Sequence, residues 1–482
     1  MTSSRRDFLR RTTCAALSAA AAQAGLRKLG LMNLLARPFA PSDYRALVCV
    51  FLDGGNDSNN MVVPTDSTHY NQYLAARPLA SGLGLDAAAL APINVPPVFS
   101  GSGRTFGFHP SLSQMAGLFN QNRLAVVSNV GPLVVPVTQS DVVNDTKPLP
   151  YSLFSHSDQI QCWSTGRADQ RIATGWGGRV ADATLACNAD SGFPTVTSID
   201  GAATFCVGIA QNPLAIDTGA LDQILVLNGY YGSPDDVARK NSMDFARTID
   251  RSALLVAAAS DVTQQAVDIG AALSVDPTLT TVFPDSDLGA QLLQVAKVIK
   301  LNQTSPQLSL NRQIFFVTQG GYDTHQDQAS DQADRFAELS GALNAFYAAT
   351  VELGLQNRVT SFTLSDFGRT LEPSGDTGSV GTDHGWGSHQ FVIGGAVNGG
   401  NFYGTPNGST GSIFPSLVFG GPDDVSPDDR GRWIPTSSVE QLGATLATWF
   451  GVAALDLPTV FPLIGNFPSA SLGFMAPGGG SC

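Results

Sequence analysis

The sequence predicts an α/β fold in which helices sandwich a mostly parallel β-sheet. Three observations predict it: short apolar runs without polar alternation, Gly, Asp or Asn at the ends of these runs, and helical segments between them. Uninterrupted apolar runs are typical of strands that are buried on both faces. Strands that alternate with helices form a parallel sheet with helices packed on both sides.

Five apolar runs are the predicted strands. They are ALVCVFLDGGND, which ends at Asp53, RLAVVSNVG, which ends near Asn129, QIFFVTQGGYDTH, which ends just before Asp323, VTSFTLSDFGRT, which ends at Asp366, and HQFVIGGAV, which follows His389. A helix is predicted in QADRFAELSGALNAFYAATVEL, because large apolar residues recur at helical spacing from Phe336 to Phe346.

Acidic residues stand just past the carboxyl ends of three predicted strands. Because ligands bind at that edge of open α/β sheets, these carboxylates are expected to converge there. Histidines lie in the same segments, and Asp together with neutral His suits zinc, manganese or iron, whereas calcium and magnesium prefer oxygen alone. We expect one or two divalent ions, held by Asp53, Asp323, His325, Asp366 and either His384 or His389. The alternative for each aspartate is a helix cap or a turn.

The amino-terminal segment predicts export. Paired arginines at positions 5 and 6 are followed by Phe-Leu, an Ala-rich stretch and the small-residue site Ala22-Gln23-Ala24. This layout is typical of a bacterial twin-arginine signal. We expect residues 1–24 to be a signal peptide that the twin-arginine export machinery recognises, delivering the folded protein to the periplasm or the outside. The alternative is a basic amphipathic helix that stays on the protein.

Composition narrows the possible partners. The net charge of −13 argues against binding to nucleic acid or to anionic membranes. No run of about 18 apolar residues follows the signal, so no transmembrane span is expected. We expect one large domain with insertions, residues 45–470, and a flexible Gly-rich tail, residues 471–482. Cys187 and Cys206 flank a short segment and could pair in an oxidising compartment, whereas Cys49 is expected to be a buried thiol.

The export signal and six further segments resemble, in order, a bacterial family of twin-arginine-exported proteins, the domain of unknown function 1501 family. The segments are VFLDGGNDSNNMVVP, SHSDQIQCWSTG, GWGGRVAD, TQGGYDTHQDQ, LSDFGRT and GTDHGWGSHQFVIGGAVNGG. They cover essentially the whole mature chain. The family is similar in its core to the alkaline phosphatase and sulfatase superfamily. The resemblance implies Asp and His ligands at the carboxyl edge of the sheet, usually around two metal ions, with a nucleophile at the start of a helix.

The resemblance also assigns ligands to positions of this chain. Asp53 matches the first-strand aspartate, with Asn56 and Asp57 as nearby polar candidates. Asp323 and His325 fall in the segment that supplies an Asp and a His to one metal. Asp366 matches the aspartate of an Asp-His pair, and His384 or His389 supplies the late histidine.

The sequence departs from the superfamily pattern at two ligand positions. Asp327 stands at the usual histidine position after Asp323, and Phe367 replaces the histidine of the Asp-His pair. The Asp383-His384 loop is expected to compensate for Phe367.

The nucleophile position is also changed. Counting back from Thr165-Gly166-Arg167, the end of the sulfatase-like motif, places His156 there. His156 is expected to act as a general acid or base, or as a nucleophile; alternatively, Ser157 attacks with His156 assisting. Arg167 or Arg369 would bind the anion through its planar guanidinium, the alternative being a structural ion pair.

Two hypotheses on function follow. The first is an exported metal-dependent hydrolase that acts on phosphate or sulfate esters of small molecules or polymers. The second is a catalytically silent relative that acts as a binding or assembly protein of the cell envelope, as the lost histidine and the lost hydroxyl nucleophile would allow. A surface enzyme of another class, active on sugars or polymers, is the third alternative.

Overall fold

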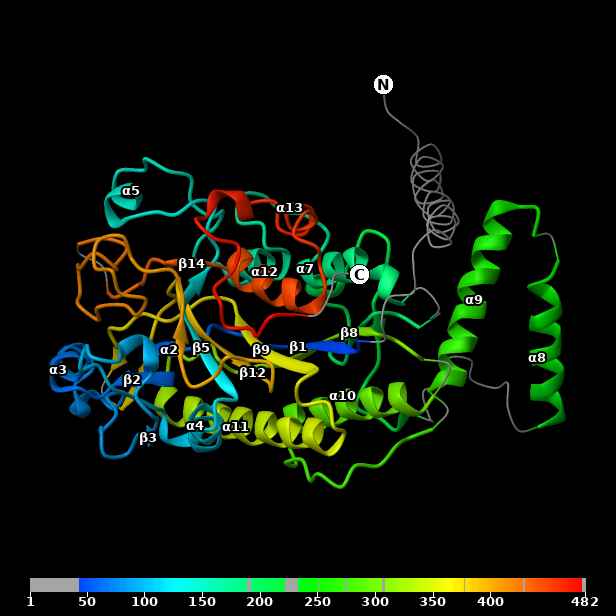
Figure 1. Ribbon diagram of the computed structural model, residues 1–482, viewed down its shortest axis with the longest axis horizontal. Coiled ribbons are helices and arrows are strands. Elements are labelled where there is room, and N and C mark those ends of the chain that lie inside the picture. The colour runs from blue at the N-terminus through cyan, green and yellow to red at the C-terminus, as the bar shows by residue number, and fades with distance from the viewer. Residues whose placement is uncertain are drawn as a thin grey trace.

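A nine-stranded sheet in the order β13-β5-β12-β9-β1-β8-β6-β7, with β14 beside β5, forms the centre of the molecule (Figure 1). The computed structural model describes residues 43–478, except 189–190, 192, 222–232, 250, 274, 306–307, 377 and 428–429. The predicted signal peptide therefore lies outside the described residues.

The sheet is mostly parallel, which confirms the predicted fold class. Its strands are β1 (Arg45–Leu52), β5 (Leu124–Gly131), β6 (Val196–Ser198), β7 (Leu214–Ala215), β8 (Arg312–Gln319), β9 (Val359–Ser365), β12 (Ser388–Ile393), β13 (Phe402–Tyr403) and β14 (Ser437–Ser438). Among the described strands of this sheet, all pairs are parallel except those that β12 makes with β5 and β9.

Both faces of the central strand β1 are buried. Residues such as Val48 and Val50 belong to the hydrophobic core on one face, and Leu47 and Phe51 belong to the core on the other. Polar alternation is therefore absent because neither face meets water. Cys49 is a buried free thiol, as predicted.

Helices cover the two faces. On one face lie α4 (Ser113–Asn120), α10 (Asp287–Thr304) and α11 (Gln328–Glu352), and on the other lie α6 (His156–Thr165), α7 (Trp176–Ala183), α12 (Val439–Phe450) and α13 (Leu457–Val460). The first group lies below the sheet in Figure 1, and α7, α12 and α13 lie above it. The predicted helical pattern is confirmed, because Phe336, Leu339, Leu343 and Phe346 are all buried on α11.

Smaller elements surround this core. They are α2 (Ser58–Met61), α3 (Ser67–Ala76), α5 (Gln139–Val143), the three-stranded sheet of β2 (Val62–Pro64), β4 (Phe106–Phe108) and β3 (Ala91–Pro92), and the hairpin of β10 (Ser374–Asp376) and β11 (Ser379–Gly381). Helices α8 (Pro234–Ala246) and α9 (Leu254–Ala272) lie beyond the sheet, at the right of Figure 1. None of the helices in the described part of the chain has the length and hydropathy needed to cross a membrane.

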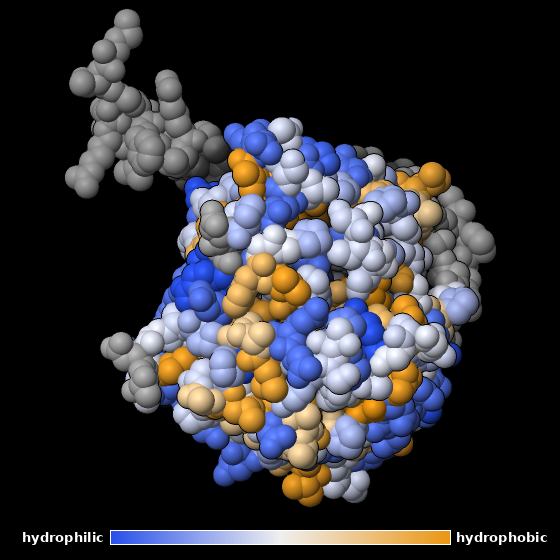
Figure 2. Space-filling view, turned by 90° about the vertical axis from the view of Figure 1, so that its left-hand side faces the viewer, coloured by the Kyte–Doolittle hydropathy of each residue, from blue (hydrophilic) through white to orange (hydrophobic). Residues whose placement is uncertain are grey.

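The surface mixes polar and apolar side chains. Figure 2 shows the side that carries α3, where orange apolar patches lie between blue hydrophilic ones. Exposed apolar side chains are ordinary on proteins, and this chain has only 14% charged residues to cover its surface.

The structure corrects the prediction for β12. This strand was expected to be parallel and to begin after His389, but it runs antiparallel and contains His389. The described part of the connection from β9 to β12 holds only the small hairpin of β10 and β11 and no helix. Parallel neighbours need a long crossover, usually a helix, whereas antiparallel neighbours do not.

The structure also describes two of the cysteines and the first residues of the predicted tail. The proposed pairing of Cys187 with Cys206 is wrong, because Cys206 is a buried free thiol while Cys187 is disulfide-bonded. Within the residues of the predicted tail, Phe474 is fully buried, and its carbonyl accepts a hydrogen bond from the Asn398 N–H at 2.9 Å. Residues 479–482 lie outside the described residues.

Candidate functional site

The candidate site lies where five segments meet at the carboxyl edge of the sheet. The segments after β1, β8 and β9 carry Asp53, Asp323 with His325, and Asp366. Because β12 is antiparallel, the loop before it enters the sheet at the same edge and brings His384 there. The first residue of α6, His156, completes the set.

His156 is oriented by the buried carboxylate of Asp366. Its Nδ1 lies 2.7 Å from Oδ2 of Asp366. Because an ionised carboxylate only accepts, Nδ1–H is the donor, and Nε2 of the neutral ring carries a lone pair. The other oxygen of Asp366 accepts the Gly54 N–H at 3.1 Å, and the side chain of Asp366 is 0% exposed.

His384 is oriented in the same way by a main-chain carbonyl. Its Nδ1–H donates to the carbonyl of Phe154 at 2.8 Å, so its Nε2 also carries a lone pair. Phe154 adopts a left-handed backbone conformation with φ of +69°, which is uncommon for an aromatic residue. The His384 Nε2 lies 3.1 Å from the His156 Nε2 and 3.0 Å from the His325 Nε2.

Asp323 brings an oxygen to the same point. Its Oδ1 lies 3.5 Å from the Nε2 atoms of His156 and His384 and 3.1 Å from the Nε2 of His325. Two ligand atoms of one tetrahedral zinc ion lie about 3.3 Å apart, given zinc–nitrogen bonds of about 2.0 Å. The donor atoms of His156, Asp323 and His384 all lie within 4.8 Å of one another, and His325 contacts two of these three residues.

The donor set fits a divalent cation. Two lone pairs that face each other cannot form a hydrogen bond unless a ring is protonated, whereas a cation between them satisfies both. Histidines that bind metals usually donate their other ring nitrogen to a carboxylate or carbonyl. His156 and His384 do so, and the Nδ1 of His325 lies 3.3 Å from the Oδ1 of Asp383.

The charges around the site shift several pKa values. The hydrogen bond that His156 donates to Asp366 raises the pKa of His156, and partial burial lowers the pKa of His384. Partial burial alone would raise the pKa of Asp323, but the hydrogen bond and the charge of Arg369 outweigh it and the pKa falls. Partial loss of surrounding water and the negative charge of Asp366 raise the pKa of Asp53.

Three of the candidate residues lie apart from this cluster. His389 is buried, its Nδ1 accepts the Asn129 N–H at 3.0 Å, and burial lowers its pKa to about 3. Ser157 is exposed. Arg167 follows the carboxyl end of α6, at the opposite end of the helix from His156, and binds Asp169 through two hydrogen bonds of 2.7 Å.

Phe367 stands at the position where the resemblance of the sequence implies a histidine. Its ring is fully buried and packs on both site histidines, with centroids 4.6 Å from His384 and 4.7 Å from His156. A Cβ on Gly55 would lie 2.4 Å from this ring, so the Gly-Gly turn after β1 makes room for it. Phe367 therefore supplies an apolar wall beside the two histidines.

Two contacts in the site went unpredicted. The Phe154 carbonyl holds His384, and no sequence signal marks it, because every residue has a carbonyl group. The second is the role of Asp383, whose Oδ2 binds Arg430 while its Oδ1 lies 3.3 Å from the Nδ1 of His325.

The chain was compared with known families and structures. The model of the family described as "Protein of unknown function (DUF1501)" matches residues 44–412. Comparison with curated protein sequences finds no match. The chain is similar to the structure of the sulfatase PsFucS1 from Pseudoalteromonas sp., with 10% identity, a TM-score of 0.32, and coverage of 95% of this chain and 77% of that one. It is also similar to the alkaline phosphatase from the Antarctic bacterium TAB5, with 10% identity, a TM-score of 0.21, and coverage of 74% and 92%.

Proposed function

The chain belongs to the DUF1501 family, and we propose that it is an exported, metal-dependent hydrolase of phosphate or sulfate esters. One observation carries the proposal: ring nitrogens with free lone pairs and a carboxylate oxygen converge at the carboxyl edge of the sheet. Sites of this composition bind zinc, manganese or iron.

We assign one ion to this site, held by His156, Asp323 and His384, with His325 beside Asp323 and His384 as a further candidate ligand. Both oxygens of Asp366 already accept hydrogen bonds from Gly54 and His156, so Asp366 orients a ligand. Phe367 supplies no donor atom for a second ion. His384 takes the position of the late histidine, because His389 is held by Asn129 in the core.

The protein groups around this ion have separate tasks. A bound divalent ion lowers the pKa of its water and neutralises the ester oxygens. The side chains of Asp323 and His325 are 49% and 45% exposed, which leaves this side of the site open to water and ester. Asp53 follows β1 at the same edge of the sheet, and its exposed carboxylate would accept a proton from the attacking water.

The geometry favours direct attack by water over a covalent intermediate. His156 donates through Nδ1 to Asp366, and its Nε2 is directed at the cluster, so neither nitrogen is available as a nucleophile. Ser157 is exposed, and its Oγ lies 3.5 Å from the Oγ of Ser155, which is not part of the histidine cluster. The phosphate or sulfate ester class rests on the resemblance of the sequence motifs.

A catalytically silent binding or assembly protein is the second candidate. The packing of Phe367 against two histidines favours it, because the ring occupies the position of a superfamily ligand. Any bound metal would then be structural.

Metal analysis and turnover test the proposal. The purified protein is expected to contain about one zinc, manganese or iron ion per chain and to hydrolyse 4-nitrophenyl phosphate or 4-nitrophenyl sulfate. Chelation and the His384→Gln variant should abolish turnover. Bound metal without turnover, together with loss of stability on chelation, would favour the silent protein. For export, replacing both arginines at positions 5 and 6 with lysine should retain the protein in the cytoplasm.

A further inference from the structure

We propose that the buried ion pair of Asp57 and Arg77 positions the metal ligand Asp323, acting through Gln328, Thr382 and Arg369. The inference rests on the metal site proposed above. Asp57 belongs to the DGGNDSNN segment after β1, and its side chain takes no part in the histidine cluster. All five side chains are buried, so their contacts are not shared with solvent.

Arg369 is the last link before the metal ligand. Its Nη1 donates to the Oδ1 of Asp323 at 2.9 Å, the same oxygen that faces the histidines. The other two nitrogens of the guanidinium donate to Thr382. Nε donates to its hydroxyl at 3.2 Å, and Nη2 donates to its carbonyl. Arg369 is 1% exposed, so its geometry fits a positioning residue for Asp323 and does not fit an anion-binding one.

Thr382 connects Arg369 to Gln328. Its hydroxyl accepts from Arg369 and donates to the Oε1 of Gln328 at 2.5 Å. The amide nitrogen of Gln328 then donates to the Oδ2 of Asp57 at 2.6 Å. Each hydrogen bond in this series therefore has one defined direction, and hydrogen bonds connected in series strengthen one another.

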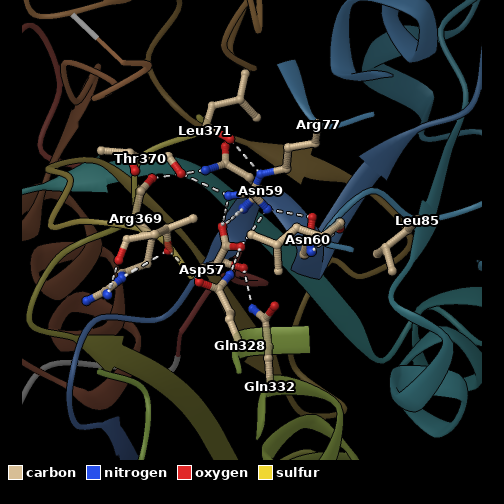
Figure 3. Close-up of polar contacts among 12 residues, drawn as sticks. Asp57, Asn59, Asn60, Arg77, Leu85, Gln328, Gln332, Arg369, Thr370 and Leu371 are labelled. Atoms are coloured by element: carbon tan, nitrogen blue, oxygen red, sulfur yellow. Dashed lines mark hydrogen bonds and ion pairs between the residues drawn. The ribbon is translucent and has the colours of Figure 1, made fainter. Parts of the chain in front are cut away.

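Figure 3 shows Asp57 at the meeting point of these contacts. Arg77 binds its two oxygens at 2.6 and 3.1 Å, and the Asn59 N–H donates to Oδ1 at 3.1 Å. The amide of Gln332 donates to the Asp57 carbonyl at 2.8 Å. The orientation of Asp57 is therefore determined by groups from three separate elements.

The same pair also holds the backbone that carries Arg369. Arg77 donates to the carbonyls of Thr370 at 2.9 Å and Leu371 at 2.6 Å, and the Asn59 amide donates to the Arg369 carbonyl at 3.0 Å. Arg369 is thus held through its main chain by Arg77 and Asn59 and through its side chain by Thr382.

The test measures metal affinity in a near-isosteric variant. Thr382→Val keeps the volume of the side chain but removes the hydroxyl that joins Arg369 to Gln328. Binding of Zn²⁺ and Co²⁺, titrated against a competing chelator, is expected to weaken about 10-fold to 100-fold, as for other residues that orient a metal ligand. The absorption spectrum of bound Co²⁺ should change as well, because it reports the geometry of the ligands. Thr382→Ser should restore both.

A matched control separates positioning from stability. Thr184 is a buried threonine that caps the carboxyl end of α7, and its hydroxyl donates to the Val180 carbonyl at 2.9 Å. Thr184→Val should leave the affinity and the Co²⁺ spectrum unchanged. If Thr382→Val does not fold, Arg369→Lys is the second variant, with the same expected loss.

Two results overturn the inference in different ways. If Thr382→Val, or Arg369→Lys in its place, binds metal as tightly as the parent protein and with the same spectrum, the network has no positioning role and the metal site stands. If the parent protein takes up neither Zn²⁺ nor Co²⁺, the metal site and the role of the network fail together.

Discussion

The Nε2 atoms of His156 and His384 face each other at 3.1 Å, although both rings donate Nδ1–H to other groups. In the neutral rings, both facing nitrogens carry lone pairs. Because two lone pairs repel, this contact requires a positive charge, which either a proton or a metal ion can supply. Asp323 beside the two rings adds the negative charge that a divalent ion prefers.

Removal of one ring should separate these possibilities. We expect His384→Gln to lower zinc affinity about 100-fold or more, because it removes a direct ligand, whereas residues that only orient a ligand contribute about 10-fold to 100-fold. His69→Gln is the control, since His69 lies on α3 outside the cluster and binds Asp66, the residue that caps the start of that helix. Equal zinc affinity of the two variants in a chelator competition would contradict the ligand assignment.

Asp366 is expected to affect metal binding through the orientation of His156. Asp366→Asn removes the negative charge that raises the pKa of His156. In the metal-free protein, the pKa of His156, followed by NMR, is expected to fall in this variant, and zinc affinity should fall about 10-fold to 100-fold. Asp261→Asn, at an exposed carboxylate paired with Arg251, serves as the control. An unchanged His156 titration would show that Asp366 does not orient the ring.

Zinc should stabilise the protein more at higher pH. In the folded, metal-free protein, the pairing with Asp366 raises the pKa of His156 above 6.5. This pairing therefore stabilises the fold below pH 6.5, and the stabilisation is lost as the pH rises through the raised pKa. Metal binding needs the deprotonated ring, so the affinity for zinc increases as the pH rises. The zinc-induced rise in melting temperature should therefore be larger at about pH 8 than at about pH 6. A larger rise at the lower pH would exclude histidine ligands.

The buried pair of Asp57 and Arg77 should also matter for stability. Arg77→Met leaves the carboxylate of Asp57 buried without its cation, and we expect a loss of about 3–5 kcal/mol in the free energy of unfolding. Arg251→Met breaks an exposed pair and should cost about 1 kcal/mol or less. Urea denaturation measures both, and similar losses would argue against the importance of burial.

A glycine at position 54 should be needed because the main chain of Asp323 lies close to it. Its φ is +116°, and a Cβ there would lie 2.4 Å from the main-chain nitrogen of Asp323. Gly54→Ala should lower both stability and zinc affinity. Gly82 has φ of +84° with nothing within 4 Å of its Cβ position, so Gly82→Ala should show only the conformational cost of about 1–2 kcal/mol. Equal effects of the two variants would mean that the close approach is unimportant.

Some features of the candidate site were predictable from the sequence, and others required the structure. The apolar runs correctly located the central strands, and Asp323 and Asp366 do follow strand ends. The sequence could not decide which carboxylate faces the histidines and which orients one of them. That distinction depends on Gly54 and His156, which are distant in the chain and approach the two oxygens of Asp366.

The sequence by itself determined the buried strands, the helix over Phe336 to Phe346, and the acidic residues and histidines at one edge. These follow from local patterns, because burial on two faces and helical spacing are properties of short segments. The tertiary structure alone decided the direction of β12, the separation of His384 from His389, and the tautomers of the histidines. Each depends on partners from distant segments, such as the Phe154 carbonyl for His384 and the Asn129 N–H for His389.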